Sequence, residues 1–454
     1  MKVYDHIMQA VGQTPCVRLH KVTQGLDAAV YVKCEHLNPG GSIKDRIAIH
    51  MVNKAEERGD IKPGATLIEP SSGNTGAGLA MMACLRGYRC IITMPDKMSQ
   101  AKVDYLRSFG AEVIICPTAV APDDPRSYYS VAKRLTKEIP NSYSPNQYEN
   151  MDNPEAHYQT TGPEIWEAFG HRIHTFVAGM GTGGTISGIS RYLKERNPNI
   201  RTVGVDPVGS VYYDYFKTGE LKNVFKSYKI EGVGEDLIPG TIDMKMVDDV
   251  VQVGDRDAFT MARRLAREEA LFVGGSAGMA VQGAIEVARK LHRGDIVVCI
   301  IPDHGDRYLA TYFNDAWMKD NQFFTDPDSM KASDILARKE RRPLTCVDVK
   351  TPLTDVSAIF KANDFSQIPV LDAGKVVGTI WEEKMLEHLL KYGADGTTKA
   401  GEIMGKSLPT VPPETGVEDI FKLFRSGASA VLVDTRGSLG IISKFDLMHS
   451  LVQK

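Results

Sequence analysis

The stretch ATLIEPSSGNTGAGLAMMACLRGYRCIITM, residues 65–94, reads as a strand, a glycine-rich turn, a helix and a second strand. Ala65–Glu69 and Arg89–Met94 are almost continuously apolar, as strands are when helices cover both faces of their sheet. The helical stretch Ala77–Arg86 lies between them and is long enough for a crossover between parallel strands. This unit predicts an α/β fold with a mostly parallel sheet.

The same alternation extends in both directions over the first three hundred residues. Further strands are expected at 112–116, 175–178, 201–205, 271–273 and 296–301. Helices are expected at 100–108, from the turn after residue 178 through Lys194, and from the turn after residue 273 through Leu291. The pattern indicates two α/β subdomains with parallel sheets.

The pattern changes after about residue 320. Residues 320–342 are polar and charged, which favours a linker with a short helix from Ser333. A repeat follows, because QIPVLDAGKVVGTIWEEKM at 367–385 matches SAVLVDTRGSLGIISKFDL at 429–447. Each copy reads as helix, strand, tight turn, strand and helix, so two small α+β units are expected side by side. The predicted boundaries are 1–320 for the first domain, 321–340 for the linker, and 341–396 and 397–454 for the two repeats.

Composition excludes several classes of protein. The 454 residues carry a net charge of −3, whereas a nucleic-acid binder usually has a clear basic excess. No apolar run approaches the roughly 18 residues of a membrane span, and the first residues lack the pattern of a signal peptide. The seven cysteines are scattered and form no CxxC pair, so neither a disulfide framework nor a zinc site is expected. These features favour a cytoplasmic protein that acts on small molecules.

Three glycine-rich turns each lie between a strand and a helix. They are Ser71–Gly76 (SSGNTG), Gly181–Thr185 (GTGGT) and Gly274–Gly278 (GGSAG). Such turns meet at the carboxyl edge of a parallel sheet, where helix N-termini offer N–H groups to anions. Serine, asparagine and glycine also favour these positions as simple caps and turns, so each segment alone has a purely structural explanation.

The second turn has a rival interpretation. Gly179–Gly184 satisfies the G-x-G-x-x-G pattern after a strand, and Asp206 follows at the end of the next strand. That is the dinucleotide-binding fingerprint in its expected context. The alternative is a loop that holds a single phosphate, and this turn contains no Gly-Lys-Ser/Thr sequence, which excludes a P-loop here.

A fourth segment, NPGGSIKDR at 38–46, contains the candidate catalytic residue. Ser42 is a plausible helix cap, which places Lys44 in the first helical turn. The helix dipole repels a cation there and lowers its pKa. A lysine with a lowered pKa suits a covalent bond to a carbonyl compound.

The four segments, in this order, resemble pyridoxal-phosphate enzymes of the tryptophan synthase β-type fold, also called fold-type II. Within that fold the chain is most similar to the cystathionine β-synthase family, on EGVGEDLIP at 231–239 and on IPDHGDRYL followed by FNDAWM at 313–318. The resemblance covers about residues 3–319, and the tail from about 341 resembles a tandem pair of CBS domains. Glu235 departs from the pattern, because animal members carry an aromatic residue at this position.

The resemblance implies pyridoxal 5'-phosphate as cofactor and assigns the site residues. Lys44 would bond covalently to the cofactor and carry protons. Ser276 would face the pyridine nitrogen, and as a neutral hydroxyl would favour loss of a β-substituent over transamination. The other expected cofactor-binding residues are Asn74, Gly181, Thr182, Gly183, Gly184 and Thr185. The expected substrate-binding residues are Ser71, Ser72, Gly73, Thr75 and Gln147.

The implied reaction is the condensation of L-serine with L-homocysteine to cystathionine and water, a step of transsulfuration that could also release hydrogen sulfide. Cysteine synthase, serine dehydratase and a sensor protein without activity remain alternatives. The CBS pair would bind S-adenosylmethionine or an adenine nucleotide at Ser443 and Asp446 of the second copy. The first copy has lost both polar groups, because Trp381 and Lys384 stand at the aligned positions. No haem, no metal, and a homodimer or homotetramer are expected.

Overall fold

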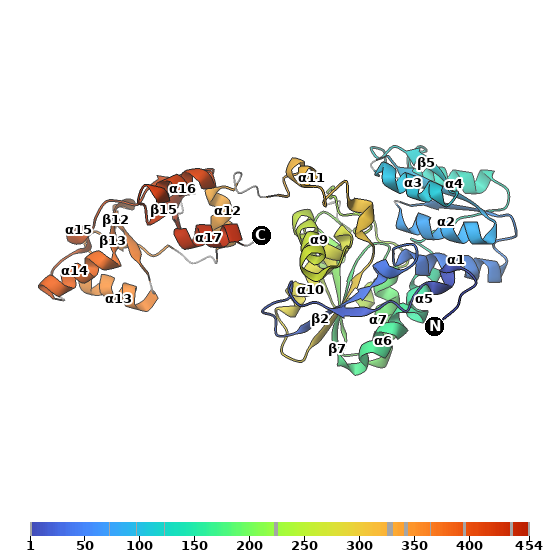
Figure 1. Ribbon diagram of the computed structural model, residues 1–454, viewed down its shortest axis with the longest axis horizontal. Coiled ribbons are helices and arrows are strands. Elements are labelled where there is room, and N and C mark those ends of the chain that lie inside the picture. The colour runs from blue at the N-terminus through green and yellow to red at the C-terminus, as the bar shows by residue number, and fades with distance from the viewer. Residues whose placement is uncertain are drawn as a thin grey trace. The chain divides into compact units, whose positions relative to one another are not determined.

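The computed structural model describes residues 2–71, 73–96, 98–121, 123–221, 226–324, 330–339, 344–363, 365–393, 396–435 and 439–452. The chain forms two compact units, Met1–Phe323 and Phe324–Lys454. Figure 1 shows the first unit in blue to yellow and the second in orange to red.

A six-stranded sheet forms the larger half of the first unit. Its strand order is β1-β2-β10-β7-β8-β9, and every pair is parallel except β1 with β2. The strands are β1 (Cys16–Arg18), β2 (Ala29–Cys34), β7 (Ile173–Gly179), β8 (Arg201–Pro207), β9 (Asp249–Val253) and β10 (Ile296–Ile301). The side chains of β10 are buried throughout, as expected for a central strand covered on both faces.

Helices cover both faces of this sheet. Figure 1 shows α9 and α10 on one side and α6 and α7 on the other. Ile186 and Ile189 of α7 pack into one core cluster with Phe176 of β7. The helices of this half are α6 (Thr161–Phe169), α7 (Gly184–Arg196), α8 (Tyr212–Thr218), α9 (Asp255–Glu269), α10 (Gly275–Ala288) and α11 (Asp315–Asp320).

A four-stranded parallel sheet of order β5-β4-β3-β6 forms the smaller half. The strands are β3 (Thr66–Pro70), β4 (Arg89–Pro95), β5 (Glu112–Cys116) and β6 (Ser142–Tyr143). Three helices pack on one face and α4 on the other, through Leu79 and Met82 of α2 and through Ala132 of α4. The helices are α1 (Lys44–Arg58), α2 (Asn74–Arg86), α3 (Gln100–Ser108), α4 (Tyr128–Glu138) and α5 (Asp152–Gln159).

The expected two α/β subdomains with parallel sheets are therefore confirmed, with one wrong element. The predicted strand Leu271–Val273 is not a strand: only Val273 forms an isolated bridge, with His304. The next strand along the chain, β10, already has β2 and β7 on its two sides, so this short segment has no place beside it. A second difference is that α2 begins at Asn74, inside the segment predicted as a turn.

The second unit contains two three-stranded sheets, one for each copy of the repeat. The first copy consists of β11 (Val347–Asp348), α13 (Leu353–Asn363), β12 (Gln367–Asp372), β13 (Lys375–Trp381) and α14 (Glu382–Tyr392). The second consists of β14 (Thr410–Val411), α16 (Val417–Arg425), β15 (Ala430–Asp434), β16 (Leu439–Ser443) and α17 (Lys444–Val452). The predicted order of helix, strand, strand and helix is confirmed in both copies.

Two short helices join these copies to the rest of the chain. α12 (Ala332–Arg338) lies in the segment predicted as a linker, and Ile335 packs into the core of the second copy. α15 (Ala400–Ile403) places Ala400 in the core of the first copy. Each copy is thus completed by a segment that precedes or follows it in the chain.

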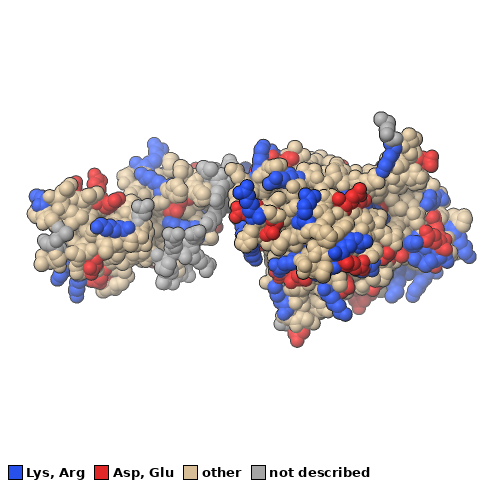
Figure 2. All heavy atoms as spheres, turned by 90° about the horizontal axis from the view of Figure 1, so that it is seen from below, with Lys and Arg blue, Asp and Glu red and all other residues tan. Residues whose placement is uncertain are grey.

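Charges of both signs are interspersed over the visible face of the first unit (Figure 2), in keeping with the net charge of −3. No helix within the described ranges is long and apolar enough to cross a membrane. The same ranges contain no group of three His, Cys, Asp or Glu side chains that would hold a metal ion.

Candidate active site

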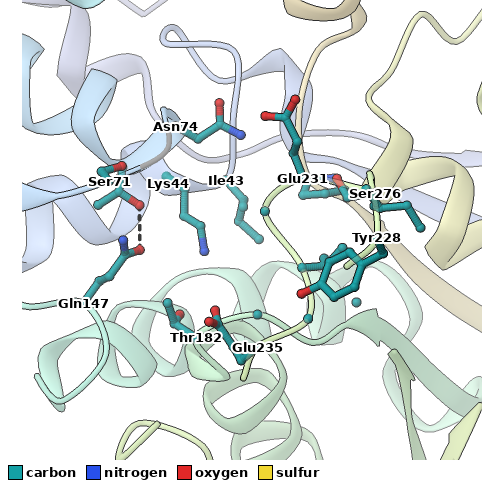
Figure 3. A pocket seen from close by; sticks show the side chains of 18 of the residues that line it. Ile43, Lys44, Ser71, Asn74, Gln147, Thr182, Tyr228, Glu231, Glu235 and Ser276 are labelled. Carbon is teal, nitrogen blue, oxygen red and sulfur yellow. Dashed lines mark hydrogen bonds between the residues drawn. The ribbon is translucent and has the colours of Figure 1, made fainter. Parts of the chain in front are cut away.

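A cavity of about 510 Å³ in the first unit is lined by residues from both halves. It brings together most of the predicted site residues (Figure 3), although they come from segments far apart in the sequence. Those that line it are Lys44, Ser71, Asn74, Thr75, Gln147, Gly181, Thr182, Gly183, Thr185 and Ser276. Gly73 and Gly184 do not line it, and Ser72 lies outside the described residues.

Lys44 is the first residue of α1, as the sequence predicts. Its backbone N–H donates to the Ser42 hydroxyl at 3.2 Å, although the residue in the N-cap position is Ile43 and not Ser42 as predicted. Its side chain extends into the cavity (Figure 3), and no described group forms a hydrogen bond or ion pair with its amine. Burial lowers the pKa of Lys44, against the opposing effect of Glu235 and Asp303. A buried amine of lowered pKa is suited to act as a nucleophile and a proton carrier.

The loop at 181–185 forms an anion-binding site at the start of α7. Gly183 has φ of 87°, a left-handed conformation that glycine adopts without strain. No described group accepts a hydrogen bond from the backbone N–H groups of Thr182, Gly183 or Gly184. The Thr182 hydroxyl accepts a hydrogen bond from the Asn153 amide at 3.0 Å, and the Thr185 hydroxyl is hydrogen-bonded to the His157 ring at 3.2 Å. Free N–H groups at a helix N-terminus bind phosphate.

The loop at 71–76 presents polar groups at the start of α2. The Ser71 hydroxyl accepts from the N–H groups of Gly73 at 3.2 Å and Gly76 at 3.1 Å, so it caps the helix and still has its own proton to donate. The buried Thr75 hydroxyl donates to Gln147 at 2.7 Å. That bond leaves the NH₂ of Gln147 available, so this corner offers donors to a carboxylate.

Asp303 lies directly behind two of the predicted residues. It follows β10 and is buried, and it accepts from the Asn74 amide at 2.9 Å. The Ser276 hydroxyl is 3.5 Å from its other oxygen. Tyr308 also donates to it at 2.6 Å. Sequence reasoning missed Asp303, although its place after the last apolar strand of a parallel sheet would have suggested it.

Arg307 completes the fixation of Asn74. Its guanidinium donates to the Asn74 carbonyl oxygen and to the Gly40 carbonyl. Both ends of the Asn74 amide are therefore engaged, which fixes its orientation.

The segment Glu231–Glu235 forms the opposite wall of the cavity (Figure 3). Glu231 pairs with Lys102 of α3, so an ion pair connects the two halves of the unit. Glu235 faces the cavity, and burial raises its pKa to about 8, with Asp236 raising it further and Lys44 lowering it. The sequence singled out Glu235 only as a departure from the resemblance.

Asp206 does not support the dinucleotide interpretation. Its side chain is fully buried and does not line the cavity. It accepts from the Tyr213 N–H at 3.0 Å, in the first turn of α8. The carboxylate that would bind a ribose in that interpretation is thus a structural cap.

In the second unit, Ser443 and Asp446 are brought together at the start of α17. Asp446 accepts from the Ser443 hydroxyl at 2.7 Å and from its N–H at 2.8 Å. Lys339, which follows α12, donates to the same carboxylate oxygen at 2.8 Å. In the first copy the Trp381 indole donates to Ser429 at 3.2 Å and Lys384 is exposed. The two copies therefore differ as the sequence predicts.

The residues present fit pyridoxal phosphate. The unpaired amine of Lys44 suits an aldehyde, and the free N–H groups at the start of α7 suit a phosphate. Both line the same cavity, as does the hydroxyl of Ser276.

Comparisons with known proteins agree with this site. The family described as pyridoxal-phosphate dependent enzyme matches residues 7–303, and the CBS domain matches 332–390 and 400–453. Cystathionine beta-synthase from Dictyostelium discoideum is 40% identical, over 99% of this chain and 93% of its own. The enzyme of the same name from Saccharomyces cerevisiae is 37% identical, over 98% and 97%.

A solved structure is also similar. The O-acetylserine dependent cystathionine beta-synthase from Helicobacter pylori matches with a TM-score of 0.63 and 38% identity, over 68% of this chain and 99% of its own. Cysteine synthase and serine dehydratase are not favoured by these matches. The predicted fold-type II enzyme with a CBS pair is confirmed, and the chain belongs to the cystathionine β-synthase family of pyridoxal-phosphate dependent enzymes.

Proposed function

We propose that the chain condenses L-serine with L-homocysteine to cystathionine and water, the β-replacement step of transsulfuration. The observation that carries this proposal is the single cavity that joins the free amine of Lys44, the free N–H groups at the start of α7 and the polar corner at Ser71, Thr75 and Gln147. An amino acid bound by its carboxylate at that corner has its α-carbon within the same cavity as the lysine.

The division of work follows from these positions. When bound, pyridoxal phosphate supplies the electron sink that acidifies the substrate's α-hydrogen. Lys44 bonds to the cofactor, removes that proton and returns it, which is typically worth a factor of about 10²–10⁴ in rate. Asn74 would orient the cofactor ring, Ser276 would face its nitrogen, and Gly181–Thr185 would hold its phosphate. Ser71, Thr75 and Gln147 hold the substrate carboxylate, with Ser72 and Gly73 in the same loop.

The experiment that tests this is a product assay on the purified protein. One reaction contains L-serine and L-homocysteine, and a second contains O-acetylserine and sulfide. Mainly cystathionine from the first supports the proposal. Mainly cysteine from the second would overturn it in favour of a cysteine synthase. A third reaction, with L-cysteine and L-homocysteine, tests for release of hydrogen sulfide by the same replacement.

The second unit is proposed to bind an adenosyl ligand. The supporting observation is the pairing of the Ser443 hydroxyl with Asp446 at the start of α17. Calorimetry with S-adenosylmethionine, AMP and ATP, on wild type and on Asp446→Asn, tests it. Heat that is lost in the variant supports the assignment, and no heat with any of the three contradicts it.

The remaining proposals concern the whole chain. We propose that the protein is a cytoplasmic homodimer or homotetramer without haem. We also propose a catalytic domain at 1–320, a linker at 321–340 and two CBS domains at 341–396 and 397–454. Light scattering tests the oligomeric state. The visible spectrum of the purified protein tests the haem, because a haem band would overturn that part.

A further inference from the structure

Among the described carboxylic acids of the cavity wall, only Glu235 has both its backbone N–H and its backbone carbonyl in hydrogen bonds. Its N–H donates to the Ser210 hydroxyl at 3.1 Å, and its carbonyl accepts from the Val211 N–H at 3.1 Å. The side chain points into the cavity beside Thr182, on the side toward which the Lys44 amine extends (Figure 3).

The surroundings of this carboxyl group favour its neutral form. No described side chain donates a hydrogen bond to it. Burial and the neighbouring Asp236 raise its pKa to about 8, with Lys44 opposing them and Asp206 contributing in the same direction as Asp236. Tyrosines supply the other titratable groups around it, from α4, the segment before α5, α8 and the cavity wall: Tyr128, Tyr129, Tyr148, Tyr212 and Tyr228.

We propose that Glu235 gives its proton to the departing hydroxyl of serine and then takes a proton from the incoming thiol. This inference rests on the proposed function. Hydroxide is a poor leaving group and needs a proton, which Glu235 can give while Lys44 keeps the α-proton for its return to Cα. Glu235 lines the same cavity as Lys44, and no side chain in the described part of the chain forms a hydrogen bond with its carboxyl group.

The proton and electron balance closes within one turnover. Lys44 removes the α-proton, and the pair of that C–H bond becomes a Cα–Cβ double bond. The Cβ–O bond breaks toward oxygen, which takes the Glu235 proton and leaves as water. The thiol then gives its proton to the Glu235 carboxylate as the S–Cβ bond forms, and Lys44 returns its proton to Cα. Glu235 ends in its starting state, and no further reactant is required.

The chemistry of the two steps suits one group. A general acid or base works best when its pKa lies near the working pH. An ordinary thiol has a pKa of about 8.5, close to that of this carboxyl group, so the proton can pass in either direction at small cost.

The test compares two amino-acid donors on the holoenzyme of Glu235→Gln. L-Serine needs a proton on its leaving group, whereas β-chloro-L-alanine loses chloride without one. Homocysteine is the acceptor for both, at pH 7, where Glu235 holds its proton and any effect on deprotonation of the thiol is common to both donors. The expected result is a loss of about 10²–10⁴-fold with serine and a loss at least tenfold smaller with the chloride. Equal losses with both donors would overturn the proposal.

Three controls make the result specific. Glu112→Gln removes a half-exposed surface carboxylate that does not line the cavity, and is expected to leave the ratio between the two donors unchanged. Glu235→Asp keeps a carboxyl group and should recover part of the serine rate. The infrared carbonyl band of a protonated carboxyl group at pH 7 should be smaller in Glu235→Gln than in wild type.

The failure of this inference differs from the failure of the proposed function. If wild type makes no cystathionine from serine, the proposed function fails. If wild type makes it and Glu235→Gln keeps the donor ratio, only the role of Glu235 fails.

Discussion

The Asn74 amide donates a hydrogen bond of 2.9 Å to the buried carboxylate of Asp303. This bond joins the start of α2 in the smaller half of the first unit to the end of β10 in the larger half. The orientation of Asn74 in the cavity therefore depends on a residue that belongs to the other sheet.

Asp303→Asn is expected to weaken cofactor binding. The carboxylate accepts from Asn74 and from Tyr308, and hydrogen bonds to charged groups contribute about 1.5–3 kcal/mol each. A loss of that size corresponds to roughly a tenfold to hundredfold weaker affinity. Titration of the cofactor-free protein with pyridoxal phosphate measures it. The matched control is Asp306→Asn, whose side chain is 59% exposed and should leave the affinity unchanged. Equal affinity for wild type and Asp303→Asn would contradict the prediction.

Lys44→Ala is expected to abolish the absorbance band of the protein-linked cofactor and to lower turnover by at least about 10²–10⁴-fold, because the amine is both the attachment point and the proton carrier. The spectrum and the cystathionine assay measure the two effects. Lys54→Ala on the same helix is the control, since Lys54 forms an exposed ion pair with Glu57 that contributes little. Turnover like that of wild type in Lys44→Ala would refute the assignment.

Much of the site could be predicted because two of the three glycine-rich turns follow a strand of a parallel sheet, β3 and β7. Local sequence decides where such a turn begins, and the fold brings the turns of both sheets to one cavity. The local sequence around Lys44 predicted that this residue lies at the start of a helix, and in the structure α1 begins at Lys44.

The remainder depends on contacts between distant segments. Asp303 binds Asn74 across 229 residues of sequence, and Lys102 pairs with Glu231 across 129. Nothing in the local pattern of either segment specifies such a partner. The predicted strand at 271–273 failed for the same reason, because its apolar residues suit a strand but β10 has no free edge. The Ser71 hydroxyl has two roles: it accepts a hydrogen bond from the first turn of α2, as the local pattern favours, and it also lines the cavity.

Gly183→Ala is expected to destabilise the loop and weaken phosphate binding. Gly183 has φ of 87°, and a Cβ there would overlap Ile242. Left-handed backbone costs about 1–2 kcal/mol for a residue with a side chain, and the overlap adds to it. Gly59→Ala separates the two causes, because Gly59 has φ of 77° and open space around it. Thermal unfolding and cofactor titration should show a loss of stability in both variants and a loss of affinity only in Gly183→Ala. Similar affinities for the two variants would count against the loop as the phosphate site.

Glu69 predicts a specific pH dependence of stability. It lies in β3, is fully buried, and accepts from the N–H groups of Asn146 at 2.8 Å and Gln147 at 3.1 Å. Burial raises its pKa to about 7, and the two N–H groups oppose the shift. The pKa in the unfolded chain is about 4.3. The fold therefore favours the neutral form, so this contribution is present below pH 4.3 and is lost as the pH rises through 7.

Glu69→Gln should remove that dependence, because the amide does not titrate. The stability of wild type relative to Glu69→Gln is expected to fall by about 3 kcal/mol between pH 4 and pH 8, measured by thermal unfolding at each pH. Glu112→Gln is the control, since Glu112 is half exposed and pairs with Arg89 at the surface. Its stability relative to wild type should be nearly independent of pH in this range. A constant difference between wild type and Glu69→Gln would show that the pKa of Glu69 in the fold equals that in the unfolded chain, about 4.3. The N–H groups of Asn146 and Gln147 would then balance the effect of burial, and Gln147 would have a charged partner at neutral pH.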